Sequence, residues 1–298
     1  MSSVEGIGQL RIPAKGGIKA YRRTLARRFL RNRAGVAGLL VALVFASAGI
    51  FAPSLRLQDP YSQDLLQVTA PPSWAHWFGT DGFGRDVFSR VVHGARYSLA
   101  VGLFATSVGM SFGGTAGVIA GFYGGRADDL VMRTVEILRA FPGLLLALLV
   151  VGILGPGLYN LMLAVGISAS PSFARVVRAS ILSTKAEDFV EAARAIGATG
   201  SRVLLRHVVP NSLGPIVVQA TLLMATSILT VASLSFLGLG PRPPIPEWGI
   251  MLSEARNYLY IAPHTTLFPG LAILMVALGF NLAGDALRDA LDIRVKVE

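Results

Sequence analysis

The sequence predicts an all-α membrane protein that crosses the bilayer about six times. Of its 298 residues, 53% are hydrophobic and only 15% are charged, whereas about a quarter of a soluble domain is usually charged. Five long stretches contain no Asp, Glu, Lys or Arg: 34–55, 97–125, 141–174, 207–241 and 257–284. A helix needs about 20 apolar residues to cross the hydrocarbon core, and each stretch is long enough.

The stretch 141–174 is too long for one helix and slightly short for two. Gly155-Pro156-Gly157 lies near its middle and favours a turn there. The helices on either side must then extend past the charge boundaries, to about Leu130 and Ile181. Six spans are therefore expected, at about residues 35–53, 97–123, 130–154, 158–180, 212–238 and 266–286.

The distribution of Lys and Arg predicts that both termini are cytoplasmic. In that orientation the inner segments hold twenty of these residues and the outer segments six, as the positive-inside rule requires. A five-span arrangement would place the C-terminus outside and weaken the asymmetry. The rule also accounts for the net charge of +10 without nucleic acid, for which no recognition motif is present.

The N-terminal region has two interpretations. The basic residues 22–33, the apolar run that follows and Ala46-Ser47-Ala48 resemble a signal peptide with its cleavage site. The apolar run is longer than the usual ~7–15 residues, and the basic region is unusually long, so we favour an uncleaved first span. Apolar Leu25, Phe29 and Leu30 among the arginines predict a basic helix on the inner membrane surface.

Glycine recurs at every fourth position of the second expected span, at Gly109, Gly113, Gly117 and Gly121. This spacing places the four residues on one helix face, where the missing side chains let another backbone approach closely. We expect a close-packed helix interface. A hinge within the span is the functional alternative.

The chain lacks the motifs by which a protein would hydrolyse ATP or hold a metal. It has no G-x-x-x-x-G-K-[ST] phosphate loop, so another chain would have to handle ATP. It also has no H-E-x-x-H motif, no cysteine and only four scattered histidines. We therefore expect no catalytic residue, cofactor or metal site.

Ionisable residues are missing from the middle of the expected spans, which disfavours a proton-coupled carrier. Arg133, Glu136 and Arg139 share one helix face near the cytoplasmic end of the third expected span. We interpret them as a mutually paired cluster at the membrane interface.

A polar segment between the fourth and fifth expected spans is the candidate functional site. Residues 187–196 are good helix formers, and Gly197 follows in the position that usually ends a helix. A second amphipathic stretch, 202–209, leads to Pro210. A short helix held between two spans can transmit force if a partner grips it, although composition alone would favour an ordinary solvated loop.

This segment resembles the coupling loop of ABC importer permeases. Glu191-Ala192-Ala193, Gly197 and Val208-Val209-Pro210 match the family's E-A-A-x-x-x-G…I-x-P pattern in spacing, with valines where Ile and Leu are common. The resemblance implies a coupling helix that docks into a groove on a separate ATPase subunit. Glu191 would pair with a basic group there and Ala192 would permit close approach. The implied site residues are Glu187, Glu191, Ala192, Ala193, Gly197 and Pro210.

Three further segments resemble the C-type permease subunit of dipeptide and oligopeptide importers. They are residues 78–99, residues 235–249 and residues 281–292, the last followed by Ile293 where proline is common. The resemblance extends from about residue 20 onward. It implies that the external segments 78–98 and 239–263 face an extracytoplasmic receptor, with Asp81, Arg85, Asp86, Glu247 and Trp248 as candidate receptor-facing residues.

The resemblance also implies a type I ABC importer permease fold and a division of the chain. A cytoplasmic basic segment (1–34) would precede the first transmembrane helix and an external segment (35–96). The importer transmembrane domain (97–290), with its coupling loop at about 182–211, would be followed by a cytoplasmic tail (291–298).

The implied function is that of a non-catalytic permease of the inner membrane, embedded in lipid and carrying di- or oligopeptides. Its partners would be a second permease, two ABC ATPase subunits and an extracytoplasmic solute-binding protein. The same family with nickel, glutathione or another small solute as cargo is the first alternative. A secondary carrier or a membrane scaffold is the distant one.

Overall fold

The computed structural model describes residues 25–291 and consists almost entirely of helices. Residues 25–31 are helical, and no β-strand forms within this described part. The short helices are η1 (Ala52–Ser54), α7 (Asp188–Ala195), α8 (Gly200–Val203), η2 (Leu204–Val208), α9 (Val209–Asn211), α11 (Trp248–Ala255) and η3 (Arg256–Tyr258). The longer ones are α2 (Arg33–Phe51), α3 (Val87–Tyr123), α4 (Gly125–Arg139), α5 (Gly143–Leu154), α6 (Leu158–Lys185), α10 (Leu213–Phe236) and α12 (His264–Leu291).

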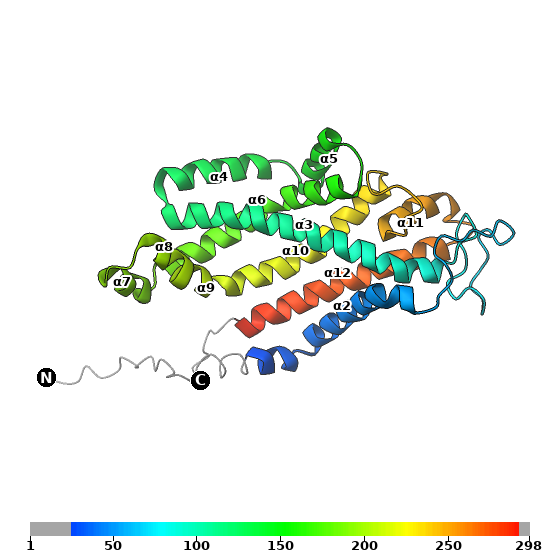
Figure 1. Ribbon diagram of the computed structural model, residues 1–298, viewed down its shortest axis with the longest axis horizontal. Helices are drawn as coiled ribbons and strands as arrows, with labels where there is room; N and C mark the ends of the chain where they lie inside the picture. Colours follow the sequence, from blue (N-terminus) through cyan, green and yellow to red (C-terminus); the bar gives the residue numbers. More distant parts are fainter. Residues whose placement is uncertain (1–24, 292–298) are drawn as a thin grey trace.

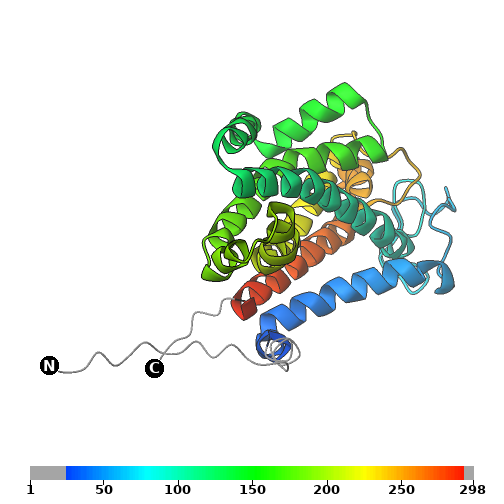
Figure 2. The same cartoon turned by 60° about the vertical axis from the view of Figure 1, so that its left-hand side comes forward.

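Five helices form the body of the molecule, and each is long and apolar enough to cross a membrane: α2, α3, α6, α10 and α12. The axes of these helices are roughly aligned along the length of the molecule (Figures 1 and 2). Helices α7, α8 and α9 lie at one end, which we call the α7 end. Helix α11 and the loop before α3 lie at the other, the α11 end. The start of α2 and the finish of α12 both point toward the α7 end (Figure 1).

The third expected span, 130–154, is not one helix. Helices α4 and α5 take its place and meet at a bend of 93°. Pro142 lies at the bend, where its ring restricts the preceding residue and removes a backbone donor. Together α4 and α5 return the chain from the α7 end, where α3 finishes, toward α6 (Figure 1). A broken span therefore replaces the expected continuous helix.

The charged residues of α4 also differ from expectation. Arg133, Glu136 and Arg139 are all exposed, and none of them is joined to another by an ion pair in the described part of the chain. The ion pair that α4 does form is between Asp128 and Arg178 of α6, at 2.5 Å. This pair, rather than the expected cluster, fastens α4 to the bundle.

The other expected spans are present as helices, several of them longer than expected. Helix α3 begins at Val87 because the carboxylate of Asp86 accepts a hydrogen bond from the backbone of Ser89 at 2.6 Å and caps the helix. The expected turn at 155–157 separates α5 from α6, and both of its glycines have positive φ.

The glycine row of α3 lies directly against α6. A Cβ atom added to Gly117 would be 2.5 Å from the carbonyl oxygen of Ala174, and one added to Gly121 would be 2.9 Å from the Ile181 side chain. Gly113 has a backbone neighbour at least as close, the carbonyl of Ser170. Helix α3 is unbroken from Val87 to Tyr123. This geometry is that of a packing interface and shows no hinge.

Replacing Gly117 by alanine is expected to destabilise the helix bundle, because the new methyl group meets the α6 backbone. Overpacking of this kind costs about 1–3 kcal/mol, measurable as a lower Tm in detergent. Gly114→Ala is the matched control, since its nearest neighbour would be a ring carbon of Phe173 at 3.7 Å. Equal melting temperatures for the two variants would contradict the packing account.

Candidate coupling site

Helix α7 stands at one end of the bundle with one face buried and the other exposed. Val190 and Ala193 pack into a core cluster that also contains Val203, Val208 and Phe173 of α6. Glu191 and Ala192 are exposed on the opposite face. The helix is therefore held by an apolar face and offers an acidic and a small residue to the outside.

Gly197 ends α7 in the way that the sequence predicts. The backbone N–H of Gly197 donates to the carbonyl of Arg194, and that of Ala198 donates to the carbonyl of Ala193. This pattern is a Schellman motif, which requires a left-handed residue after the helix. Gly197 has φ +83°, a value that residues with a Cβ rarely adopt.

Residues 187–211, which we call the coupling segment, are joined to α6 and α10 by buried hydroxyl groups. The Ser212 hydroxyl donates to the carbonyl of Val208 and to the hydroxyl of Thr184, both at 2.9 Å. The Ser180 hydroxyl donates to the carbonyl of Ser212 at 3.0 Å. Because Ser180 and Thr184 belong to α6, these bonds tie the end of the segment to α6 at the start of α10.

The return path from α7 to α10 contains irregular helix. Residues 204–208 form a π-helical turn, and such turns are frequently found at functional sites. Pro210 follows within α9. Because its nitrogen is part of the ring, it has no backbone N–H to donate. The local backbone is therefore less regular than that of the spans which it connects.

The six residues assigned to coupling do not all reach the surface. Glu187, Glu191, Ala192, Gly197 and Pro210 are exposed, whereas Ala193 is buried. Ala193 packs inward beside Val190 because it lies on the apolar face of α7. Ala193 therefore anchors the helix, and Glu191 with Ala192 forms its outer face.

At the α11 end, the segment before α3 is organised by buried charges. Arg85 forms ion pairs with Asp81 at 2.7 Å and with Glu254 at 2.7 Å. Arg90 reaches the same Glu254 at 3.2 Å and Asp81 at 3.4 Å. The two arginine side chains are 2% and 0% exposed. Two acids and two bases thus tie the loop, the first turn of α3 and α11 into one unit.

A second contact joins α11 to the spans through Glu247 and Trp248. The Glu247 carboxylate caps α11 by accepting hydrogen bonds from the backbone of Gly249 and Ile250 at 3.0 Å. The Trp248 indole N–H donates to the carbonyl of Val91 in α3 at 3.0 Å. Both side chains are buried, at 1% and 0% exposure.

Burial raises the pKa of the Glu247 carboxyl above its ordinary value, and the hydrogen bonds from Gly249 and Ile250 partly oppose that rise. Because the folded-state pKa is raised, the stability that this group contributes is complete below the unfolded pKa. It is lost as the pH rises through the folded pKa.

The structure places four of the five candidate receptor-facing side chains inside the molecule. Arg85, Asp86, Glu247 and Trp248 are buried, and Asp81 is only partly exposed. They are buried because each completes an ion pair, a helix cap or a core contact. In the isolated chain these four side chains support the surface of the α11 end from beneath and do not form it.

Three important residues were missed from the sequence. Glu254 and Arg90 complete the buried ion network, and Ser212 makes the central bonds of the coupling joint. Arg90 stands four residues after the helix cap Asp86, a spacing that could have placed it on the inner face of α3. Nothing local distinguishes Glu254 or Ser212.

One sequence pattern in α3 has no catalytic geometry. Gly109-Met110-Ser111-Phe112-Gly113 fits G-x-S-x-G, the pattern of hydrolase nucleophiles, which requires a sharp turn between strand and helix. Ser111 instead lies inside a continuous helix, and its hydroxyl donates to the carbonyl of Ser107 at 2.8 Å. Within residues 25–291, no three His, Asp or Glu side chains are grouped to hold a metal ion.

The chain matches the family described as the binding-protein-dependent transport system inner membrane component over residues 113–297. The chain belongs to this family. Residues 21–72 of the permease also match the N-terminal TM domain of oligopeptide transport permease C.

Curated relatives of the permease are similar over most of its length. It is 48% identical to the dipeptide transport system permease protein DppC of Alkalihalophilus pseudofirmus, over 89% of this chain and 88% of the relative. It is also 48% identical to the glutathione transport system permease protein GsiD of Pectobacterium atrosepticum, over 91% and 90% of the two chains.

A solved structure shares the fold of the permease. It is an inward-facing conformation of the MetNI methionine ABC transporter, with a TM-score of 0.55 and 24% sequence identity. The similarity covers 68% of this chain and 97% of the other. At this identity the likeness shows the fold alone.

Replacing Glu254 by glutamine is expected to destabilise the α11 end of the permease. The change removes the charge shared by Arg85 and Arg90, and breaking a buried ion pair costs about 2–4 kcal/mol. Thermal unfolding in detergent measures the effect. Asp129→Asn, at an exposed position on α4, is the control and should leave Tm unchanged; a similar Tm for both variants would mean that the network contributes little.

Proposed function

We propose that this permease is the membrane-spanning, non-catalytic subunit of an ATP-driven, binding-protein-dependent importer for peptides. The observation that carries the proposal is the exposed face of Glu191 and Ala192 on a short helix anchored between two spans. A separate ATPase would bind that face. The membership in a binding-protein-dependent transport family supports the same assembly.

The route by which force would travel begins at α7. Only Ala186 and Glu187 separate α6 from α7, and Ser212 joins the far end of the coupling segment to α6. A push on α7 therefore moves α6 and the start of α10. Since the glycine row of α3 is packed on α6, α3 follows. ATP-driven closure would favour one of two states through its differential affinity for them.

The far end of α3 would then present the external surface to a solute-binding protein. Arg90 in the first turn of α3 binds Glu254 of α11, so the loop before α3 and α11 move with that helix. We propose that both termini are cytoplasmic, because the α7 end would face the ATPases. A second permease would complete the pore, and two ATPase subunits would bind beneath the pair.

Peptides are the proposed cargo because one relative is named a dipeptide permease and another matched segment belongs to an oligopeptide permease. A second candidate is glutathione, which the other relative is named for. The two are separated by measuring ATP-dependent uptake of labelled dipeptide and labelled glutathione into vesicles that contain the complete transporter. Uptake driven by a proton gradient without ATP would contradict the importer proposal altogether.

Glu191→Lys is expected to leave insertion and thermal stability unchanged, because the side chain is exposed, but to lower ATP-dependent uptake by at least about tenfold. Loss of a charged hydrogen bond of about 1.5–3 kcal/mol at the interface accounts for that size. ATPase co-purification should fall with it.

Asp129→Lys makes the same charge reversal at an exposed position of α4, outside the coupling segment, and serves as the control. It should retain both uptake and ATPase binding. Normal uptake by Glu191→Lys would remove this residue from the coupling contact.

A further inference from the structure

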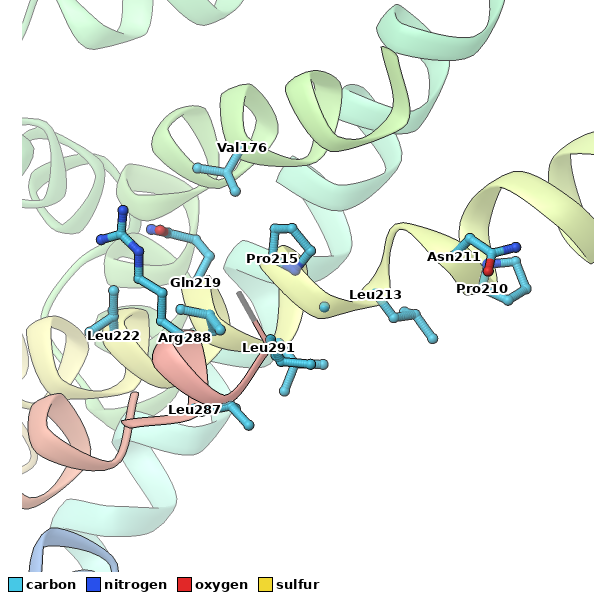
Figure 3. Close-up of a pocket in the computed structure, with 13 residues that line it drawn as sticks. Val176, Pro210, Asn211, Leu213, Pro215, Gln219, Leu222, Leu287, Arg288 and Leu291 are labelled. Atoms are coloured by element: carbon cyan, nitrogen blue, oxygen red, sulfur yellow. The ribbon is translucent and has the colours of Figure 1, made fainter. Parts of the chain in front are cut away.

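A groove opens beside the coupling segment, where α6, α10 and α12 converge. It has a volume of about 900 Å³. Residues of the first three turns of α10 form one wall, and Leu287, Arg288 and Leu291 of α12 form the other. Val176 comes from α6, and Pro210 of the coupling segment lies at the rim (Figure 3). The groove is thus in contact with the element that would receive the push of the ATPase.

The groove is mostly apolar but contains one positive charge. Arg288 is the charged residue in its lining, and no acidic residue lines it. The Gln219 amide extends from the wall of α10, and in Figure 3 its polar end lies on the same side of the groove as that of Arg288. Within residues 25–291, neither side chain forms an ion pair or a side-chain hydrogen bond. The Arg178 guanidinium, by contrast, forms a hydrogen bond and an ion pair with the Asp128 carboxylate.

These two groups are unsuited to contact with lipid. Gln219 lies six residues inside α10, about 9 Å along the helix axis at 1.5 Å per residue. An amide without a partner is costly in hydrocarbon. The exposed face of α12 farther along is apolar, with Leu271, Leu274 and Leu278. The groove therefore differs from the lipid-compatible faces of the same bundle and calls for water or a polar ligand.

We propose that this groove is a binding site for the carboxylate of a peptide and lies on the inner half of the transport path. The inference rests on the proposed function and assigns a cargo site to it. The Arg288 guanidinium can bind a carboxylate through two parallel N–H donors, and the Gln219 amide can donate a third hydrogen bond. Leu222 and Val217 offer apolar contact to a side chain of the cargo.

The size and openness of the groove agree with a site that must also release its ligand. A volume of about 900 Å³ is within the range of small-molecule sites, and a di- or tripeptide is of that class. A single arginine in an open groove binds a carboxylate weakly, and a transport site must be weak enough for the cargo to leave. Because Pro210 lies at the rim of the groove, its movement with the coupling segment would change the shape of the opening.

The first test uses the absence of cysteine from the chain. The complete transporter carrying Gln219→Cys is prepared in inside-out vesicles. It is treated separately with a negatively charged and with a positively charged thiosulfonate reagent, and the rate of labelling of this subunit is measured. Because a water-filled positive groove attracts anions, the negatively charged reagent should label the Gln219→Cys variant faster than the positively charged reagent does. Adding Arg288→Gln should lower the anion-to-cation ratio by about tenfold. Leu274→Cys, exposed on the apolar face of α12, is the control and should remain unlabelled.

The second test identifies the ligand. A dipeptide with a free C-terminal carboxylate, added on the ATPase side, should slow labelling of Gln219→Cys, whereas the same peptide with a C-terminal amide should not. Arg288→Gln should abolish the difference; Arg256→Gln, an exposed arginine at the α11 end, should preserve it. Equal protection by both peptides, or labelling as slow as that of Leu274→Cys, would overturn the proposal.

Vesicles of purely zwitterionic lipid separate the cargo from a lipid headgroup. Protection should be the same there as in anionic vesicles, and a requirement for anionic lipid would overturn the proposal in favour of a lipid site. Neither labelling experiment needs ATP. Failure of ATP-driven uptake would therefore count against the proposed function, and failure of peptide protection against this site.

Discussion

The close packing of α3 on α6 is the contact on which the rest of the structure depends. The glycines of α3 allow its backbone to approach that of α6 at successive turns, which no larger residue would permit. Helix α6 continues almost directly into the coupling segment, and the opposite end of α3 carries the buried ion network. The two ends of the molecule are therefore connected through one closely packed pair of helices. In lipid such a pair is held by packing, since apolar surfaces gain nothing by leaving hydrocarbon.

The two ends are built by different physical means. At the α11 end, two buried arginines meet two partly exposed carboxylates, and each arginine is stabilised because it reaches both acids. At the α7 end, hydroxyl groups and small apolar residues form the joint. The α11 end is thus held mainly by charge, and the α7 end by hydroxyl hydrogen bonds and apolar packing.

The helical spans, the α7 helix with its Gly197 terminus and the glycine face of α3 could all be predicted from the sequence, because each depends on local composition or spacing. The bend between α4 and α5 is missed, although Pro142 marks it in the sequence, because the apolar stretch is interpreted as one continuous span. The ion pair of Asp128 with α6 has no local signal. The burial of Arg85 could not be predicted either. Charged residues are normally exposed, and the partner Glu254 lies 169 residues away in the chain. The groove at Arg288 likewise depends on three helices that meet only in the folded bundle.

The central claim is that α7, α6 and α3 move as one body when the ATPases close. Spin labels at Arg194→Cys on α7 and Arg96→Cys toward the α11 end of α3, both exposed positions, allow the distance between them to be measured in the complete transporter. The account predicts the same distance distribution with and without bound ATP. A second distance, from Arg194→Cys to a label on the second permease, should change under the same conditions. A change in the first distance on ATP binding would contradict the account.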